Sequence, residues 1–458
     1  MLYQVLRSAA RVALHWYYSE VIVQGRERIP VRGSVLVVAN HPNALVDALL
    51  VAIAVDRRVL LTAKATLFEH PFLAPLLNMI GVVPLRRAKD EHATPGDRAA
   101  VFRNADAFRM VTDALRREHV VLVFPEGISH DESSLAPLKS GAARMALMAR
   151  DAEARGLHIL PIGLVYEEKE RPRSRVLVRV GEPIDLDAWY VTSSSADALM
   201  LTREMDTRLR QLTLNFATAE RASRAVGMAR ALAALAGEPP PFEEGTDFAS
   251  EADIASRVGA VIEALEYATP ALVSAVDAFT SRLSGVEARL AARGIALSDV
   301  RISIQVRQGA RFVLREAVLS ILALPIAAVG RVAHWLPIRA ARVLALHSIA
   351  NHTSRDEPAM RTIVFGMAAL LLWYCGLTVL LTRWLGGVAA AICLIAVFVA
   401  GQVDLALEDR LTRVWKRART YRALRGDTAL RTGAIEEIDA LLEQALALEK
   451  ALIHSEGL

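Results

Sequence analysis

The sequence predicts an α/β fold, with a mixed or largely parallel sheet flanked by helices, followed by a helical insert and C-terminal transmembrane helices. In the first half of the chain, short runs dominated by Val, Ile and Leu alternate with stretches of helical spacing; the runs are VIVQG, SVLVVAN, RVLLTAK, GVVPLRR, VVLVFPEG, HILPIGLVY and RVLVRVGEP. Runs that are apolar at successive positions are typical of strands buried on both faces. Helices between such strands supply the cover that both faces need. We therefore place an α/β domain over residues 31–217.

The composition indicates a membrane protein. Of the 458 residues, 53% are hydrophobic but only 6% are aromatic, and the mean hydropathy is +0.30. This excess of aliphatic residues fits long helices and membrane segments better than an all-β fold. The basic residues are mostly arginines beside apolar segments near both ends of the chain, which favours contact with anionic membrane lipids and not with nucleic acid. The two cysteines both lie in apolar runs and provide neither a disulfide framework nor a metal site.

Three segments outside the α/β domain predict helices that do not span a membrane. Residues 1–30 combine an amphipathic helix, expected to lie in the bilayer interface, with a first strand. Residues 218–310 carry Ala, Glu and Arg at helical spacing and predict an insert of two to four helices. Residues 405–458 predict a basic, amphipathic C-terminal helix.

A membrane region is expected over residues 311–404. Residues 363–381 and 385–403 are each close to the ~20 apolar residues that a spanning helix needs, so they predict a tight hairpin. Residues 317–338 are long enough to span but contain two prolines and Arg331, so a span, a re-entrant segment and an interfacial helix pair all remain open. Arginines at both ends of the hairpin favour the cytoplasm for both ends. The Arg- and Ala-rich composition favours the bacterial cytoplasmic membrane.

A histidine and an aspartate follow the predicted strand Val35–Ala39, in the text VVANHPNALVDALL. Open α/β sheets place ligands at the carboxyl ends of their strands, where Asn40 and His41 stand here. A carboxylate such as Asp47, bonded to one ring nitrogen of a histidine, lets the other nitrogen act as a general base. Taken alone, a histidine at the end of a strand is more often structural.

Three further motifs stand at the ends of predicted strands. GVVPLRR carries Arg86, whose guanidinium suits a phosphate, although an ordinary basic turn has the same residues. VLVFPEG ends in Glu126 and Gly127, a carboxylate and a close-approach residue that suit a polyol. Lys139 precedes the start of a helix, which favours an anion. In HILPIGLVY, Pro161 is expected to interrupt a strand.

In this order the four motifs resemble those of the phospholipid and glycerol acyltransferase family, which includes glycerol-3-phosphate and 1-acylglycerol-3-phosphate acyltransferases. The resemblance covers about residues 15–217. It implies that His41 is the catalytic base and Asp47 its partner. The substrate-binding residues that it implies are Asn40, Arg86, Glu126, Gly127 and Lys139. It also implies that no metal or cofactor is needed, and that acyl-CoA or acyl carrier protein is the co-substrate.

The spacing of the catalytic pair departs from the family's commonest pattern, which has four residues between histidine and aspartate. Here there are five, Pro42 to Val46. On a regular helix the longer spacing would take the two side chains off one face, so the loop must hold an extra residue at Pro42–Asn43. A branch of the family with fungal glycerol-3-phosphate and dihydroxyacetone-phosphate acyltransferases shares this spacing. That resemblance favours glycerol 3-phosphate as the acceptor.

The expected function is therefore transfer of a fatty acyl group to glycerol 3-phosphate in phospholipid biosynthesis at a membrane. Lysophosphatidate and dihydroxyacetone phosphate are alternative acceptors, because each presents a hydroxyl and a phosphate. A non-catalytic lipid-binding membrane scaffold is the alternative of another class. Membrane lipids and the acyl donor are the expected partners, whereas the sequence predicts no oligomeric state.

Overall fold

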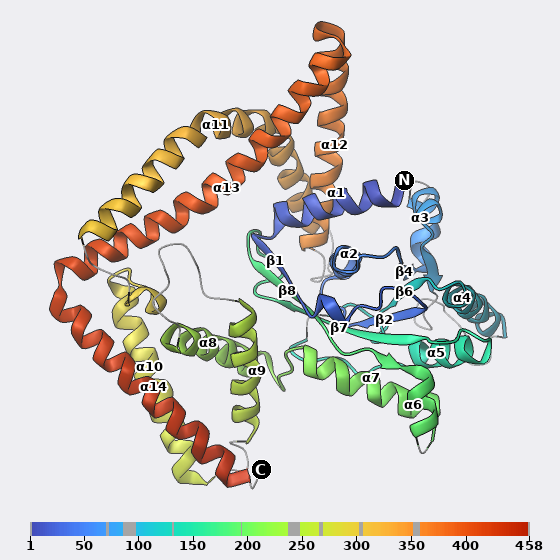
Figure 1. Cartoon of the computed structure of the whole chain (residues 1–458), viewed down its shortest axis with the longest axis horizontal. Coiled ribbons are helices and arrows are strands. Elements are labelled where there is room, and N and C mark those ends of the chain that lie inside the picture. Colours follow the sequence, from blue (N-terminus) through green and yellow to red (C-terminus); the bar gives the residue numbers. More distant parts are fainter. Residues whose placement is uncertain are drawn as a thin grey trace. The chain divides into compact units, whose positions relative to one another are not determined.

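The computed structural model describes nine stretches of the chain (Figure 1): residues 2–69, 73–85, 98–130, 132–193, 195–236, 248–264, 269–301, 306–350 and 358–456. They form two compact units. The first holds residues 1–215 and 345–364, and the second holds residues 216–344 and 365–458. Each unit has a buried apolar core of its own.

A seven-stranded mixed sheet organises the first unit. Its order is β1-β8-β7-β2-β6-β3, and β9 pairs with β7. All neighbours are parallel except that β7 is antiparallel to β8 and to β9. The predicted mixed, largely parallel sheet is confirmed. The strands are β1 (Glu20–Gln24), β2 (Val35–Ala39), β3 (Val59–Leu60), β6 (Val120–Val123), β7 (His158–Tyr166), β8 (Arg175–Val180) and β9 (Ile184–Asp185).

The run RVLLTAK, expected as one strand, is divided between two sheets. Its first part is β3, whereas β4 (Thr62–Lys64) pairs in parallel with β5 (Val83–Leu85) in a second sheet of two strands. The hydroxyl of Thr62 donates to the carbonyl of Leu122 in β6 at 2.9 Å. A side chain thus replaces the backbone as the link to the main sheet, and the chain turns away from it.

β7 is one continuous strand of nine residues, so the prediction that Pro161 interrupts it is wrong. The carbonyl of Pro161 accepts from Gly181 N, which shows that its backbone polar groups face away from β2. On that side β9 pairs with residues 158–159 and β8 with residues 162–166. Pro161 lies between the two pairings, where the N–H that proline lacks is not needed.

Helices cover both faces of the sheet, with α1 and α2 on one side and α4, α5 and α7 on the other (Figure 1). Leu36 and Val38 of β2 share a core cluster with Val111 and Leu115 of α4, because alternate strand residues point to the same face. The helices of this unit are α1 (Leu2–Tyr17), α2 (Ala44–Ala54), α3 (Leu73–Ile80), α4 (Arg98–Arg116), α5 (Gly141–Asp151), α6 (Leu186–Thr192) and α7 (Ala198–Leu212).

Arg7 ties α1 to the end of α2. Its guanidinium donates to the carbonyls of Ala52, Ile53 and Val55 at 2.7–3.2 Å. The last carbonyls of a helix have no partner within the helix, and a cation there also complements the helix dipole. Arg7 therefore fixes α2, the helix that carries Asp47, to the amino-terminal helix.

The second unit is helical throughout its described residues. Within the predicted insert, α8 packs against α9, and α8 and α10 share a core cluster with α14. The elements of this part are α8 (Ala219–Ala236), α9 (Phe248–Ala264), α10 (Pro270–Ala292), the 3-10 turn η4 (Leu297–Asp299) and the C-terminal α14 (Thr428–Glu456).

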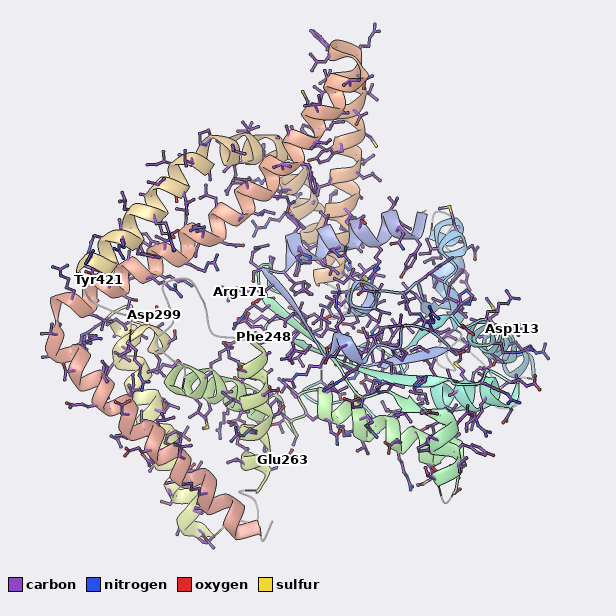
Figure 2. All side chains as sticks on the ribbon, viewed as in Figure 1. Asp113, Arg171, Phe248, Glu263, Asp299 and Tyr421 are labelled. Carbon is purple, nitrogen blue, oxygen red and sulfur yellow. The ribbon has the colours of Figure 1, made fainter. Side chains whose placement is uncertain are left out.

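Three long helices mark the chain as a membrane protein: α11 (Val306–Ala350), α12 (Pro358–Leu385) and α13 (Gly387–Gly426). By length and composition each can cross a membrane. Many of their aliphatic side chains point outward (Figure 2), among them Leu372 at 74% and Val388 at 80% exposure, as lipid contact requires. α12 and α13 meet at Gly386, whose φ of +81° suits a sharp turn.

α11 continues as one helix through Pro325 and Pro337 and carries Arg331 in its apolar stretch. The guanidinium of Arg331 pairs with Asp404 at 2.8 Å and with Glu408 at 2.7 Å, both on α13. A charge in an apolar segment is costly unless a partner is at hand, and α13 supplies two. Whether α11 spans, re-enters or lies in the interface stays a prediction.

We expect Gly163→Ala to destabilise the first unit. A Cβ on Gly163 would stand 2.4 Å from the carbonyl oxygen of Leu212, where α7 ends against β7. Relieving such a backbone contact typically costs ~1–3 kcal/mol, so the unfolding midpoint in detergent should fall by at least ~2 °C. Gly141→Ala is the control, since its Cβ meets nothing within 4 Å. Equal unfolding midpoints for Gly163→Ala and Gly141→Ala would contradict the close contact between Gly163 and Leu212.

Candidate active site

The loop after β2 is anchored to β7 by the side chain of Asn40. Its amide nitrogen donates to the carbonyl of Leu164 at 3.0 Å, and its amide oxygen accepts from Leu164 N at 2.7 Å. The pair extends the contact between β2 and β7 beyond the last backbone register, Ala39 against Ile162. These contacts indicate that Asn40 positions the loop after β2 against β7. Substrate binding by Asn40 stays a prediction.

His41 and Asp47 are in direct contact, as the sequence predicts. Nδ1 of His41 lies 2.9 Å from a carboxylate oxygen of Asp47, which is fully buried. Because an ionised carboxylate only accepts, Nδ1 carries the proton and Nε2 keeps a free lone pair. No group in the described part of the chain bonds to Nε2. This is the arrangement that a general base requires.

A kink at the start of α2 accommodates the longer spacing. α2 begins at Ala44, whose φ is +44°, and the N–H of Ala44 donates to the hydroxyl of Ser129 at 3.1 Å. Asp47 therefore lies in the first turn of the helix, and the additional residue is absorbed before it. The geometry thus explains how five intervening residues still allow the contact.

The Asp47 carboxylate accepts hydrogen bonds from three groups. One oxygen accepts from His41 and, at 2.7 Å, from Asn43 N. The other accepts from the hydroxyl of Tyr166 at 2.5 Å. Burial and the Asp47 charge raise the pKa of Tyr166, so the hydroxyl stays protonated and donates. Asp47 is thereby held in one position against the imidazole.

Tyr18 and Phe124 complete the surroundings of the pair. The hydroxyl of Tyr18 accepts from the amide of Asn43 at 3.1 Å, and burial raises the pKa of Tyr18. The ring of Phe124 stacks on His41, with centroids 3.8 Å apart and planes 9° from parallel. The imidazole is therefore held by one bond at its edge and one ring on its face.

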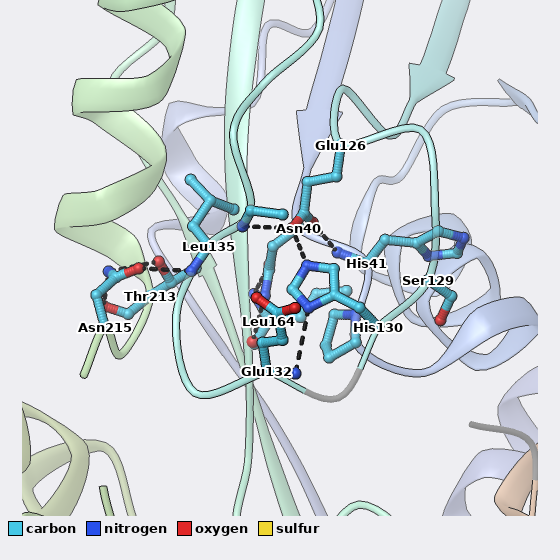
Figure 3. A network of polar contacts seen from close by, with 12 residues as sticks. Asn40, His41, Glu126, Ser129, His130, Glu132, Leu135, Leu164, Thr213 and Asn215 are labelled. Atoms are coloured by element: carbon cyan, nitrogen blue, oxygen red, sulfur yellow. Dashed lines mark hydrogen bonds and ion pairs between the residues drawn. The ribbon is translucent and has the colours of Figure 1, made fainter. Parts of the chain in front are cut away.

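Glu126 links the loop after β6 to His41. One of its oxygens accepts from His41 N at 2.7 Å; the other accepts from Ala136 N at 2.9 Å and from Nε2 of His130 (Figure 3). The Glu126 side chain has no exposed surface. Binding of an acceptor hydroxyl by Glu126 stays a prediction, and the contacts indicate that it also positions the His41 backbone.

His130 is a site residue that sequence reasoning left as a loop residue. Besides its ring contact with Glu126, its N–H donates to the carbonyl of His41 at 3.3 Å. The hydrogen bond to Glu126 raises the pKa of His130 despite partial burial. The only sequence signal was the pattern EGISH, in which the histidine follows the glutamate by four residues.

Gly127 and Lys139, both predicted to bind substrate, lie against each other. Gly127 has a φ of +72°, and a Cβ there would stand 2.7 Å from Nζ of Lys139. The N–H of Lys139 donates to the carbonyl of Pro125 at 2.8 Å, which brings the lysine to the end of β6. The exposed ammonium lies beside the FPEG turn, where it suits an anionic acceptor. Arg86 lies outside the described residues.

Tyr18, Asn43 and Tyr166 also escaped the sequence analysis. Tyr166 ends the run HILPIGLVY, so it lies at the same sheet edge as His41, but nothing in the sequence joins it to Asp47. A metal site is not indicated, since no group of three or more His, Cys, Asp or Glu side chains in the described residues is placed to hold an ion.

Comparison with known proteins relates this site to acyltransferases. Residues 20–165 match the family model described as Acyltransferase. Glycerol-3-phosphate O-acyltransferase 2 of Saccharomyces cerevisiae is 42% identical over 88 residues, 19% of this chain and 12% of that protein. The 1-acyl-sn-glycerol-3-phosphate acyltransferase of Borreliella burgdorferi is 25% identical over 160 residues, 35% of this chain and 57% of that protein. The chain thus spans less than two thirds of each relative.

Among solved structures, the 1-acyl-sn-glycerophosphate acyltransferase of Thermotoga maritima is similar, at 21% identity and a TM-score of 0.36. The match covers 46% of this chain and 77% of that one. A likeness at this level supports no argument about the site.

We expect the stability difference between the wild type and His130→Gln to depend on pH. A pKa raised on folding gives stability that is fully present below the unfolded value of ~6.5 and is lost as pH rises through the folded value. The variant should therefore be less stable than the wild type near pH 5.5, and the gap should shrink by pH 9. The difference between their unfolding midpoints, measured in detergent at each pH, tests this expectation. A gap that is constant with pH would contradict the protonated His130–Glu126 pair.

Proposed function

We propose that this chain, whose residues 20–165 match the Acyltransferase family model, is a glycerolipid acyltransferase that transfers a fatty acyl group to glycerol 3-phosphate in phospholipid biosynthesis. The observation that carries the proposal is the 2.9 Å contact between His41 and the buried Asp47 at the carboxyl end of β2. It leaves Nε2 as a base whose tautomer is fixed.

In the proposed reaction, His41 Nε2 takes the proton of an acceptor hydroxyl while that oxygen attacks the thioester carbonyl of acyl-CoA or acyl carrier protein. The imidazolium that forms is stabilised by Asp47. Collapse of the tetrahedral intermediate breaks the carbon–sulfur bond, and the proton on His41 passes to the departing thiolate. The products are the acyl ester and the free thiol, and His41 is regenerated. No metal or cofactor is required in this proposal.

Two observations support the proposed acceptor: the positive charge beside Gly127 and the names of the similar proteins. Lys139 beside Gly127 offers a cation for a phosphate, and we propose that Arg86 adds a second. Glycerol 3-phosphate is favoured because the relative named for it has 42% identity, against 25% for the lysophosphatidate enzyme. Lysophosphatidate and dihydroxyacetone phosphate remain the alternative acceptors.

A non-catalytic lipid-binding scaffold is the alternative of another class. It would have no need for a histidine with a buried carboxylate on Nδ1 and a lone pair on Nε2. Two separate elements, the loop before α2 and β7, bond to Asp47 and hold that geometry. The cost of burying a carboxylate is better explained by catalysis than by binding.

For the location, we propose the cytoplasmic side of a bacterial cytoplasmic membrane for the sheet domain. In the sequence, arginines lie on both sides of the hairpin, Arg355 and Arg361 before its apolar part and further arginines at 410–425 after it, and they support this side. Labelling of a cysteine placed at Arg116, an exposed position of α4, from outside intact cells would contradict the orientation.

We expect His41→Ala to lower kcat by ~10²–10⁴-fold, the usual contribution of a positioned base, with little change in the KM for the acceptor. The assay uses purified full-length protein, acyl-CoA or acyl carrier protein as donor, and the three acceptors in parallel, with and without a chelator. His158→Ala is the matched control, because His158 lies at the opposite, amino end of the parallel strands.

Glycerol 3-phosphate should give the highest kcat/KM of the three acceptors. Undiminished turnover by His41→Ala would end the catalytic proposal, whereas a preference for another acceptor would end only the substrate assignment. Loss of activity with the chelator would contradict a reaction that needs no metal.

Tyr166→Phe should lower kcat by about tenfold, since it removes a hydrogen bond to a charged group, worth ~1.5–3 kcal/mol, from the buried Asp47. Tyr17→Phe is the control: Tyr17 is also buried, but its hydroxyl donates to the Glu170 carbonyl. Equal kcat in the two variants would show that the Tyr166 bond does not position Asp47.

A further inference from the structure

A basic pocket lies between α11 and α13 in the second unit. Four arginines line it, Arg315 on α11 and Arg410, Arg413 and Arg417 on α13, together with one carboxylate and three apolar side chains. Its volume is about 280 Å³, several times the ~30 Å³ that a water molecule takes in the liquid. The pocket has room for a phosphate and the groups attached to it.

Glu316, the carboxylate of the pocket, holds two of the arginines in place. It is buried, and it accepts from Arg315 at 2.9 Å and from Arg410 at 2.8 Å. One negative charge thus serves two guanidinium groups, and the pocket keeps a formal excess of three positive charges. Asp299 of η4 (labelled in Figure 2) interacts with Arg417 and reduces that excess to two.

The pocket lies near the end of the apolar part of both helices. The apolar run of α13 ends at Val403, and Arg410 follows seven residues later, ~10 Å along a helix. This is slightly more than the roughly 5–8 Å of the headgroup layer on each side of the hydrocarbon, and a long arginine side chain can extend back toward that layer. On α11, Arg315 and Glu316 directly precede the apolar stretch, and their pairing with Arg410 brings both helices to one level.

Ion pairs fix the distance between the two helices. Arg331 of α11 bonds Asp404 and Glu408 of α13, and a Cβ on Gly330 would collide with the backbone at Ala400. The helices therefore approach closely on one side of the pocket and are held there. A preformed pocket needs little ordering when a ligand enters.

We propose that this pocket binds the phosphate of an anionic phospholipid of the surrounding bilayer. Guanidinium groups match phosphate oxygens in charge and in planar geometry, and basic pockets between membrane helices recognise such headgroups. Leu319 lines the pocket and is 40% exposed, so it offers an apolar contact for the acyl part of the lipid. A choline headgroup would bring its own cation against the arginines. This site is separate from the proposed acceptor site at His41.

The test uses full-length protein in detergent and counts bound lipid by native mass spectrometry. The probes are phosphatidylglycerol, phosphatidylcholine of the same chain length, and inorganic phosphate as competitor. The variant is Arg413→Gln with Arg417→Gln, which leaves the Glu316 pairs intact. The control is Arg419→Gln with Arg422→Gln, which removes the same charge from the same helix outside the pocket lining.

We expect the wild type and the control to bind phosphatidylglycerol with affinities within about twofold, and the pocket variant at least tenfold more weakly. Equal loss in both variants would mean a diffuse charge effect and would overturn the site. Equal binding of phosphatidylcholine would overturn headgroup recognition. Displacement by inorganic phosphate at the same concentration as the lipid would mean a free-anion site and would overturn the assignment to lipid. None of these results depends on catalysis at His41.

Discussion

The whole arrangement of the site depends on one buried carboxylate, that of Asp47. A carboxylate with no exposed surface is tolerated only when hydrogen bonds replace the water it has lost. Here three groups provide them from two places in the chain: His41 and Asn43 N from the loop before α2, and Tyr166 from β7. The same bonds that satisfy the charge fix the imidazole, so the stability of the fold and the geometry of the proposed base share one cause.

A second buried carboxylate, that of Glu126, holds the loops around His41 in place relative to one another. It joins the turn after β6 to the backbone of His41, to His130 and to Ala136. The Asn40–Leu164 pair does the same between β2 and β7. Both contacts have one physical reason: the backbone groups of a loop at a sheet edge need hydrogen-bond partners. Gly127 and Lys139 lie against each other at the end of β6, where we propose that the acceptor binds.

In the second unit, charged side chains also need partners, because they lie beside long apolar stretches of helix. Arg331 and Glu316 would each be costly beside long aliphatic stretches, but α13 supplies Asp404, Glu408 and Arg410 as partners. Charge pairing therefore determines which faces of α11 and α13 meet. The pocket between these helices is lined by four arginines and one carboxylate, and this positive charge is the basis for the proposed lipid pocket.

The sheet class, the strand ends that carry the motifs and the apolar helices could be predicted from the amino-acid sequence, because they follow from local patterns of apolar runs and helical spacing. The pairing of His41 with Asp47 could also be predicted, because the four motifs together resemble those of acyltransferases. Sequence reasoning missed Tyr166, which is 119 residues from Asp47, the task of Glu126 beneath His41, and the continuity of β7 through Pro161. These features became visible in the folded structure, because each depends on which distant segment of backbone lies alongside. Hydrogen-bond partners that a sheet brings together leave no periodic pattern in the sequence.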